Sequence, residues 1–135
     1  TSIAAWSAEA GLANLAPPLM LDAASPDWPL DSADALLCIN MVHISPWAAT
    51  PGLFAGAARL LPVGAPLVLY GPYVEADVAT AESNLAFDAS LRARNPEWGL
   101  RDTADVKAAA TEAGFASAER RAMPANNLML LFRRD

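Results

Sequence analysis

The sequence is poor in charge and in residues that cross-link or bind metals. Only 18% of its 135 residues are charged, and it contains one cysteine and one histidine. The lone Cys38 excludes an internal disulfide framework, and no His, Cys or carboxylate stands at metal-ligand spacing, so we predict no metal site. Hydrophobic residues make up 54% of the chain. This composition argues against disorder and predicts a single domain over 1–135 with a substantial core.

Basic residues are also scarce, with nine Lys and Arg against fifteen Asp and Glu, for a net charge of -6. This balance argues against a nucleic-acid partner, because phosphate binding relies on clustered cations. No apolar run approaches the roughly 20 residues that cross a bilayer, and the N-terminus lacks the features of a secretory signal, so we predict no membrane partner and a cytoplasmic location. Since the chain starts at Thr1 inside a predicted helix, we expect a fragment or a trimmed chain.

Periodicity and turn residues predict alternating helices and strands. Helical spacing, proline and glycine positions and capping residues set the helix bounds, and apolar runs set the strands. The predicted helices span 2–10, 51–61, 81–94 and 102–113, and the predicted strands span 19–22, 35–43, 65–73, 117–123 and 127–134.

This order predicts an α/β sheet that is mostly parallel, with an antiparallel hairpin at its C-terminal edge. The run at 35–43 is apolar without alternation, which is typical of a central, parallel strand covered on both faces. A helix then connects it to the strand at 65–73, as in a parallel crossover. The residues at 124–127 favour a tight reversal, which makes the last two strands a hairpin.

Ligands of open α/β sheets bind beyond the carboxyl ends of the strands. That rule selects Asp22, the segment from Asn40 to His43, and the segment from Tyr70 to Tyr73. Asp22 either accepts a hydrogen bond from an exocyclic amine such as that of adenine, or caps the following turn. His43 either acts as a general base or hydrogen-bonds within its turn to Ser45.

The predicted helix at 81–94 carries a polar row. Asn84, Asp88 and Arg92 stand four residues apart on one helix face, where they either line a pocket or form a solvated ladder. Beyond the helix, Trp98 and Arg101 either hold a planar or anionic substrate, or Trp98 only covers the core edge. The chain has no G-x-S-x-G elbow, P-loop or H-E-x-x-H helix, which argues against hydrolase and kinase functions.

Four segments in order cover most of the chain and carry a family resemblance. They are CINMVHISPW at 38–47, GLFAGAARLLPVGAPLVLYGPY at 52–73, SNLAFDASLRARNPEWGLRD at 83–102 and MPANNL at 123–128. They resemble a small class I S-adenosylmethionine-dependent methyltransferase-like family, of the methyltransferase-like protein 26 type. The resemblance implies a Rossmann-like sheet, S-adenosylmethionine as cofactor, and a small-molecule or protein substrate.

The resemblance also assigns roles to residues. It implies that Asp22, with Ala23, contacts adenine and that Asn40 and Met41 lie beside the methionine moiety of the cofactor. Asn40 and His43 would lie near the transferred methyl group as the catalytic residues. The substrate pocket would be formed by Tyr73, Asn84, Asp88, Arg92, Arg101, Asn126 and Asn127.

One departure from the family pattern weakens the expected cofactor site. Family members begin with a strand and a glycine-rich loop, followed by a second strand that ends in an acid, and the 135 residues contain neither. The resemblance therefore implies a sheet that lacks its first two strands and binds the cofactor weakly, because loop N–H groups hold the cofactor's carboxylate.

In the complete fold the two strands would lie between 19–22 and 35–43. Their absence leaves three alternatives: a changed packing of 1–30, strands supplied by another chain, or an exposed edge that forms a homodimer, which we favour. The alternative function is a non-catalytic binding or interaction module. The C-terminal hairpin argues against a third hypothesis, a nucleotide-dependent oxidoreductase.

Overall fold

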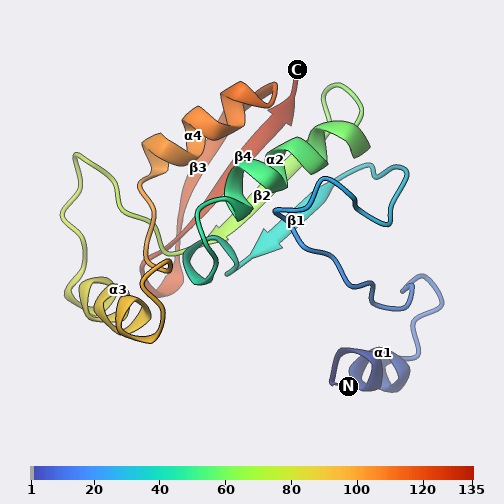
Figure 1. Ribbon diagram of the computed structural model, residues 1–135, viewed down its shortest axis with the longest axis horizontal. Coiled ribbons are helices and arrows are strands. Elements are labelled where there is room, and N and C mark those ends of the chain that lie inside the picture. Colours follow the sequence, from blue (N-terminus) through green and yellow to red (C-terminus); the bar gives the residue numbers. More distant parts are fainter. Residues whose placement is uncertain (1) are drawn as a thin grey trace.

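The computed structural model describes residues 2–135 and confirms a mixed α/β fold (Figure 1). Thr1, where the chain was expected to start within a helix, lies outside the described residues. No helix in the part that is described is long and apolar enough to cross a membrane. The helices are α1 (Ser2–Ala10), α2 (Ala49–Leu60), α3 (Glu82–Arg94) and α4 (Thr103–Glu112), the strands are β1 (Leu36–Ile39), β2 (Pro66–Gly71), β3 (Phe115–Met123) and β4 (Asn127–Arg134), and the 3₁₀ turns are Val42–Ile44 and Pro124–Asn126.

The four strands form one sheet in the order β1-β2-β4-β3. β1 pairs with β2 in parallel, and β4 pairs antiparallel with both β2 and β3, so three of the four strands run in one direction. The predicted hairpin is confirmed, but β4 lies inside the sheet rather than at its edge. The apolar β4 buries Leu128, Leu130 and Phe132, whereas β3 is mostly exposed and takes the edge position.

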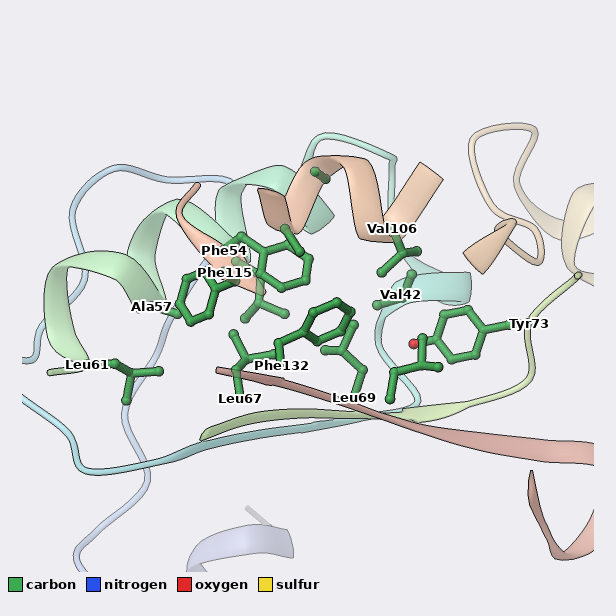
Figure 2. Packing of buried hydrophobic residues seen from close by; sticks show 14 of the residues in the cluster. Val42, Phe54, Ala57, Leu61, Leu67, Leu69, Tyr73, Val106, Phe115 and Phe132 are labelled. Carbon is green, nitrogen blue, oxygen red and sulfur yellow. The ribbon is translucent and has the colours of Figure 1, made fainter. Parts of the chain in front are cut away.

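The core lies between the sheet and the two helices α2 and α4, which cover one of its faces (Figure 2). Phe54 of α2 contacts Phe132 edge-on, with ring centroids 5.2 Å apart, and also packs against Phe115. Leu67 and Leu69 of β2 complete the fully buried layer below these rings. This layer fixes α2 over β1 and β2, and so fixes the ends of both strands.

β1 is parallel, as expected, but it is an edge strand rather than a central one. Leu36 and Cys38 pack against the core cluster, whereas Leu37 and Ile39 are 62% and 56% exposed. The continuous apolar run that predicted burial on both faces is buried on one face only. The other edge of β1 is open among the described residues.

The predicted strand at 19–22 is wrong, because residues 11–35 contain neither helix nor strand. A strand needs a neighbour for its backbone hydrogen bonds, and this segment runs apart from β1 (Figure 1). The apolar side chains at 19–21 are exposed, Met20 to 95%. The helix predicted at 2–10 is confirmed as α1, which buries none of its residues.

Capping explains the start of α4 but not that of α2. Asp102 caps α4 as predicted, because its Oδ1 accepts a hydrogen bond from Ala104 N at 2.8 Å. α2 begins at Ala49, earlier than predicted, so Thr50 lies within the first turn instead of capping it. The Thr50 hydroxyl is buried and has no hydrogen-bond partner among residues 2–135.

Candidate functional site

The site begins where β1 and β2 end side by side. The Asn40 N–H donates to the Tyr70 carbonyl at 2.8 Å, which is the last bond between the two strands. Asn40 has a φ of 53°, a left-handed conformation that asparagine tolerates better than most residues. This conformation turns the chain sharply into Val42–Ile44 and leaves the Asn40 and His43 side chains at the carboxyl edge of the sheet.

Asn40 and His43 converge over Gly71. A Cβ atom on Gly71 would lie 3.3 Å from Asn40 Oδ1 and 3.4 Å from His43 Nδ1. Because Gly71 has no side chain, both polar groups pack directly on the end of β2. The structure therefore brings together the two residues that were expected to be catalytic.

His43 is only 4% exposed, and its ring meets Phe87 edge-on with centroids 5.5 Å apart. Burial lowers the pKa of His43 below its ordinary value of 6.5, so the imidazole is neutral at pH 7 and can accept a proton. The alternative bond to Ser45 is not formed, because the Ser45 hydroxyl donates to the Met41 carbonyl at 2.9 Å. The His43 carbonyl instead accepts from Gly99 N at 3.0 Å.

Two hollows flank the segment that follows β1. Ile39, Met41 and Ser45 line a cleft of about 880 Å³, which we call the apolar cleft. Asn40 and His43 line a second hollow of about 650 Å³, which we call the His43 pocket. The complete lining of the His43 pocket is Asn40, His43, Ile44, Pro72, Ser83, Asn84, Phe87, Arg94, Ala125, Asn126 and Asn127.

The apolar cleft contains most of the residues expected to bind the cofactor. Asp22, Ala23 and Met41 line it, whereas Asn40 lines the His43 pocket instead. Asp22 Oδ1 accepts from Ala24 N at 2.9 Å, so this carboxylate caps the following turn, which was one of its two predicted roles.

Two glycines of α2 hold the wall of this cleft in place. A Cβ atom on Gly52 would overlap the Ala23 carbonyl, and one on Gly56 would overlap the Trp28 indole. These glycines stand four residues apart and so lie on one helix face. Without their side chains, residues 23–28 lie directly on α2, which places Asp22 and Ala23 at the cleft.

Three of the expected substrate residues lie in the His43 pocket. Asn84, Asn126 and Asn127 line it, and the same three line a smaller adjoining pocket of about 170 Å³ together with Tyr73. Asn84 Nδ2 donates to the Asn126 carbonyl at 3.1 Å, which ties α3 to the turn at Pro124–Asn126. The Tyr73 ring is buried, with its oxygen turned toward the core (Figure 2), and burial raises its pKa.

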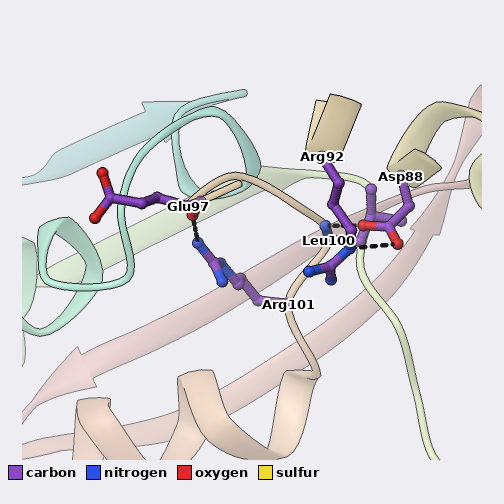
Figure 3. A network of polar contacts seen from close by, with 5 residues as sticks. All are labelled: Asp88, Arg92, Glu97, Leu100 and Arg101. Atoms are coloured by element: carbon purple, nitrogen blue, oxygen red, sulfur yellow. Dashed lines mark hydrogen bonds and ion pairs between the residues drawn. The ribbon is translucent and has the colours of Figure 1, made fainter. Parts of the chain in front are cut away.

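Asp88 and Arg92 do not line the His43 pocket. Asp88 accepts from Leu100 N at 2.7 Å and from Arg92 Nε at 2.9 Å, as Figure 3 shows. Both side chains pack on Gly99, whose N–H binds the carbonyl of His43. These two residues therefore fix the loop behind the site rather than face a ligand.

Arg101 also lies outside the His43 pocket. Its Nη2 donates to the Glu97 carbonyl at 2.6 Å (Figure 3) and to the Ser45 carbonyl at 3.0 Å. The guanidinium lies over the Trp47 ring, 5.7 Å from its centroid, and both residues line a separate hollow of about 500 Å³. Arg101 therefore joins the loop at 97–101 to the segment that carries His43.

Sequence reasoning found Asn84 on α3 but missed other residues of this helix that face the pocket. Phe87 and Arg94 line it together with Ser83 and Asn84. Positions three, seven and ten residues beyond Asn84 stay on one helix face, whereas a strict spacing of four drifts around the helix. The mixed spacing Asn84, Phe87, Leu91, Arg94 was the signal that would have found them.

A protein-family model described as "Protein of unknown function (DUF938)" matches residues 1–134. The chain belongs to the DUF938 family. The finer assignment to the methyltransferase-like protein 26 type stays a prediction.

Solved methyltransferases share the fold of this DUF938 chain. The mitomycin 7-O-methyltransferase MmcR matches 97% of it with a TM-score of 0.81 and 19% identity, and LaPhzM matches 99% with a TM-score of 0.80 and 14% identity. Human N-acetylserotonin methyltransferase, solved with S-adenosylmethionine, matches 80% with a TM-score of 0.70 and 15% identity. The chain covers 38%, 39% and 31% of these three chains, respectively. At these identities the likeness establishes a class I methyltransferase-like fold.

Proposed function

We propose that the chain forms the acceptor pocket and part of the cofactor site of an S-adenosylmethionine-dependent methyltransferase. The acceptor is a small molecule or a protein side chain. The observation that carries this proposal is the position of Asn40 and His43. They stand where the two parallel strands end, with the apolar cleft on one side of their segment and the His43 pocket on the other.

The residues of the apolar cleft fit one end of the cofactor. Its apolar walls suit an adenine ring, Asp22 offers a carboxylate to the exocyclic amine, and Met41 lies next to the catalytic pair. The 135 residues contain no glycine-rich loop whose N–H groups would hold the amino-acid end. Cofactor binding by these residues alone is therefore weak, and polypeptide outside them completes the site.

In this proposal the bound cofactor supplies the methyl group, and the residues of the chain position the acceptor and remove its proton. The neutral His43 would accept the proton of an acceptor hydroxyl or amine as that group bonds to the methyl carbon, the carbon–sulfur bond breaks and S-adenosylhomocysteine is left. Asn40 orients the acceptor through its amide, and the Phe87 wall limits access of water to His43. Such transfer depends chiefly on alignment of the reacting atoms and needs no metal.

The test is calorimetry with S-adenosylhomocysteine. We expect weak or undetectable binding to the 135-residue chain and clear binding to the protein translated from its complete gene. Absence of binding to both would refute the methyltransferase function. In the complete protein, Asn40→Ala and His43→Ala should each lower turnover, and unchanged turnover would remove that residue from the mechanism.

A second candidate function, a non-catalytic interaction module, rests on the open edge of β1. Leu37 and Ile39 are exposed there, and α1 buries none of its residues. Exposed edge strands readily pair with another chain. In this case the chain forms a homodimer through β1, and light scattering should report a dimer that Leu37→Lys converts to a monomer. A monomeric wild-type chain would refute this function.

A further inference from the structure

The His43 pocket has an unusual charge for this protein. The chain carries a net charge of -6, yet the eleven residues that line the pocket, all within the described part of the chain, include no Asp or Glu and a single permanent cation, Arg94. The remaining polar groups are mostly the amides of asparagine. The local field therefore favours an anion in a molecule that otherwise repels anions.

Arg94 is available to a ligand. Its Nε donates to the Ser90 carbonyl at 3.4 Å, so the side chain runs back along α3, and its guanidinium lies 5.9 Å from the centroid of the Trp98 ring. The ion pairs that residues 2–135 form engage Arg92, Arg120 and Arg121, and none includes Arg94. Its charge is held beside the pocket without a carboxylate partner.

The rest of the pocket suits a flat ring. Phe87 and His43 meet edge-on and form an aromatic wall, and the Asn40 amide lies beside His43 over Gly71. The Ser90 turn, over which Arg94 lies, is three residues beyond Phe87, or about 4.5 Å along the helix axis. Arg94, Asn40 and His43 thus line one hollow together with the Phe87 ring.

We propose that the His43 pocket binds a planar aromatic acid that carries a hydroxyl group, with the acid group at Arg94 and the hydroxyl group at Asn40 and His43. This proposal rests on the proposed function for the reaction that follows, but binding itself needs neither the cofactor nor the apolar cleft. It defines the substrate class as hydroxylated aromatic acids rather than amines or aliphatic alcohols.

Three probes of similar shape and different charge test this proposal. They are 4-hydroxybenzoate, the neutral 4-hydroxybenzamide and the cationic 4-hydroxybenzylamine, each titrated into the 135-residue chain at up to millimolar concentration. His43 is the only histidine, so its imidazole NMR signals report occupancy without ambiguity. We expect the acid to bind about tenfold more tightly than the amide, since a charge-assisted hydrogen bond is roughly twice as strong as a neutral one. The amine should bind most weakly.

Two arginine variants distinguish binding of the acid in the pocket from a general effect of positive charge on the protein. Arg94→Gln should abolish the preference for the acid, whereas Arg121→Gln, which removes the same charge from the exposed strand β3 outside the pocket, should keep it. Arg94 is exposed, so its replacement leaves the fold intact. Equal binding of acid and amide, a preference that survives Arg94→Gln, or no His43 shift with any probe would overturn the proposal.

The outcome can be distinguished from that of the proposed function. If the acid binds through Arg94 but the complete protein binds no S-adenosylhomocysteine, the binding site stands and the methyltransferase function fails. If the complete protein binds S-adenosylhomocysteine and methylates an acceptor without any preference for acids, the methyltransferase function stands and the substrate class is wrong.

Discussion

Gly56→Ala should destabilise the protein, although helix propensity alone predicts the opposite. Alanine is favoured over glycine inside a helix by about 1 kcal/mol. At Gly56, however, the added Cβ would overlap three atoms of the Trp28 indole. The ring must leave its place against the core, and Trp28 is a partly buried side chain of that core. Losing this packing costs about 2–3 kcal/mol, so we expect a net loss of about 1–2 kcal/mol.

The assay is urea denaturation of Gly56→Ala with and without Trp28→Ala. In the wild-type background the variant should lower the free energy of unfolding. In the Trp28→Ala background, where no ring is in the way, the same change should raise it by about 1 kcal/mol. This reversal of sign separates the clash from helix propensity.

Displacement of Trp28 should also release residues 20–30, which limited proteolysis or hydrogen exchange would detect. Because this segment carries Asp22 and Ala23 to the apolar cleft, cofactor binding by the complete protein should weaken as well. If Gly56→Ala stabilises the wild-type chain and leaves the segment protected, residues 23–28 do not lie on α2 and the described cleft is wrong.

Four further predictions concern single side chains. Burial lowers the pKa of His43 below 6.5, so the unfolded chain binds a proton on this imidazole more readily than the folded chain does. The free energy of unfolding should therefore fall as the pH drops below 6.5, and it should fall less in His43→Gln. Burial raises the pKa of the Cys38 thiol from 9.0 to about 11, so reaction with Ellman's reagent at pH 8 should be about 100-fold slower in the folded chain than in urea; equal rates would contradict this burial. Thr50→Val removes a buried hydroxyl without a partner and should stabilise the chain by about 1 kcal/mol in urea denaturation. Asp102→Ala removes the cap of α4 and should lower the melting temperature, with a loss of about 1 kcal/mol.

Local signals predicted most of the fold correctly. The helix at 102–113 follows from its Asp102 cap, and the C-terminal hairpin follows from the reversal at 124–127. Both depend on interactions between residues close in sequence. The helix at 81–94 and the strand at 65–73 also agree with the structure to within two residues, because proline or glycine stands at or near their ends.

The errors at 19–22 and 35–43 share one cause. An apolar run indicates that side chains are suited to burial, but it does not say which polypeptide buries them. In the structure the first run has no strand beside it, and the second, β1, is covered on one face only. Such a run predicts a strand only if a neighbouring strand is present.

The site was predicted in part, for reasons of geometry. The carboxyl-end rule correctly placed Asn40 and His43 together, because it depends only on the parallel pairing of β1 and β2. Of the polar row on α3, Asn84 lines the pocket, whereas Asp88 and Arg92 turn toward Gly99 and away from it. The choice of helix face depends on how α3 docks, and that docking involves the distant Asn126.

The two hollows differ in whether they need polypeptide beyond the 135 residues. This difference links cofactor binding to the association of a further strand with β1. The His43 pocket is lined by residues from 40–44, α3 and the turn at 124–127, which contact one another, so its affinity should not depend on further polypeptide. The apolar cleft lies along β1, where Leu37 and Ile39 remain more than half exposed. Burying these two side chains contributes roughly 2 kcal/mol in all, which is a small part of any association through this edge. A cofactor that binds only the completed cleft adds its own binding free energy to that association. Cofactor and completing strand should therefore strengthen each other's binding, while ligands of the His43 pocket affect neither.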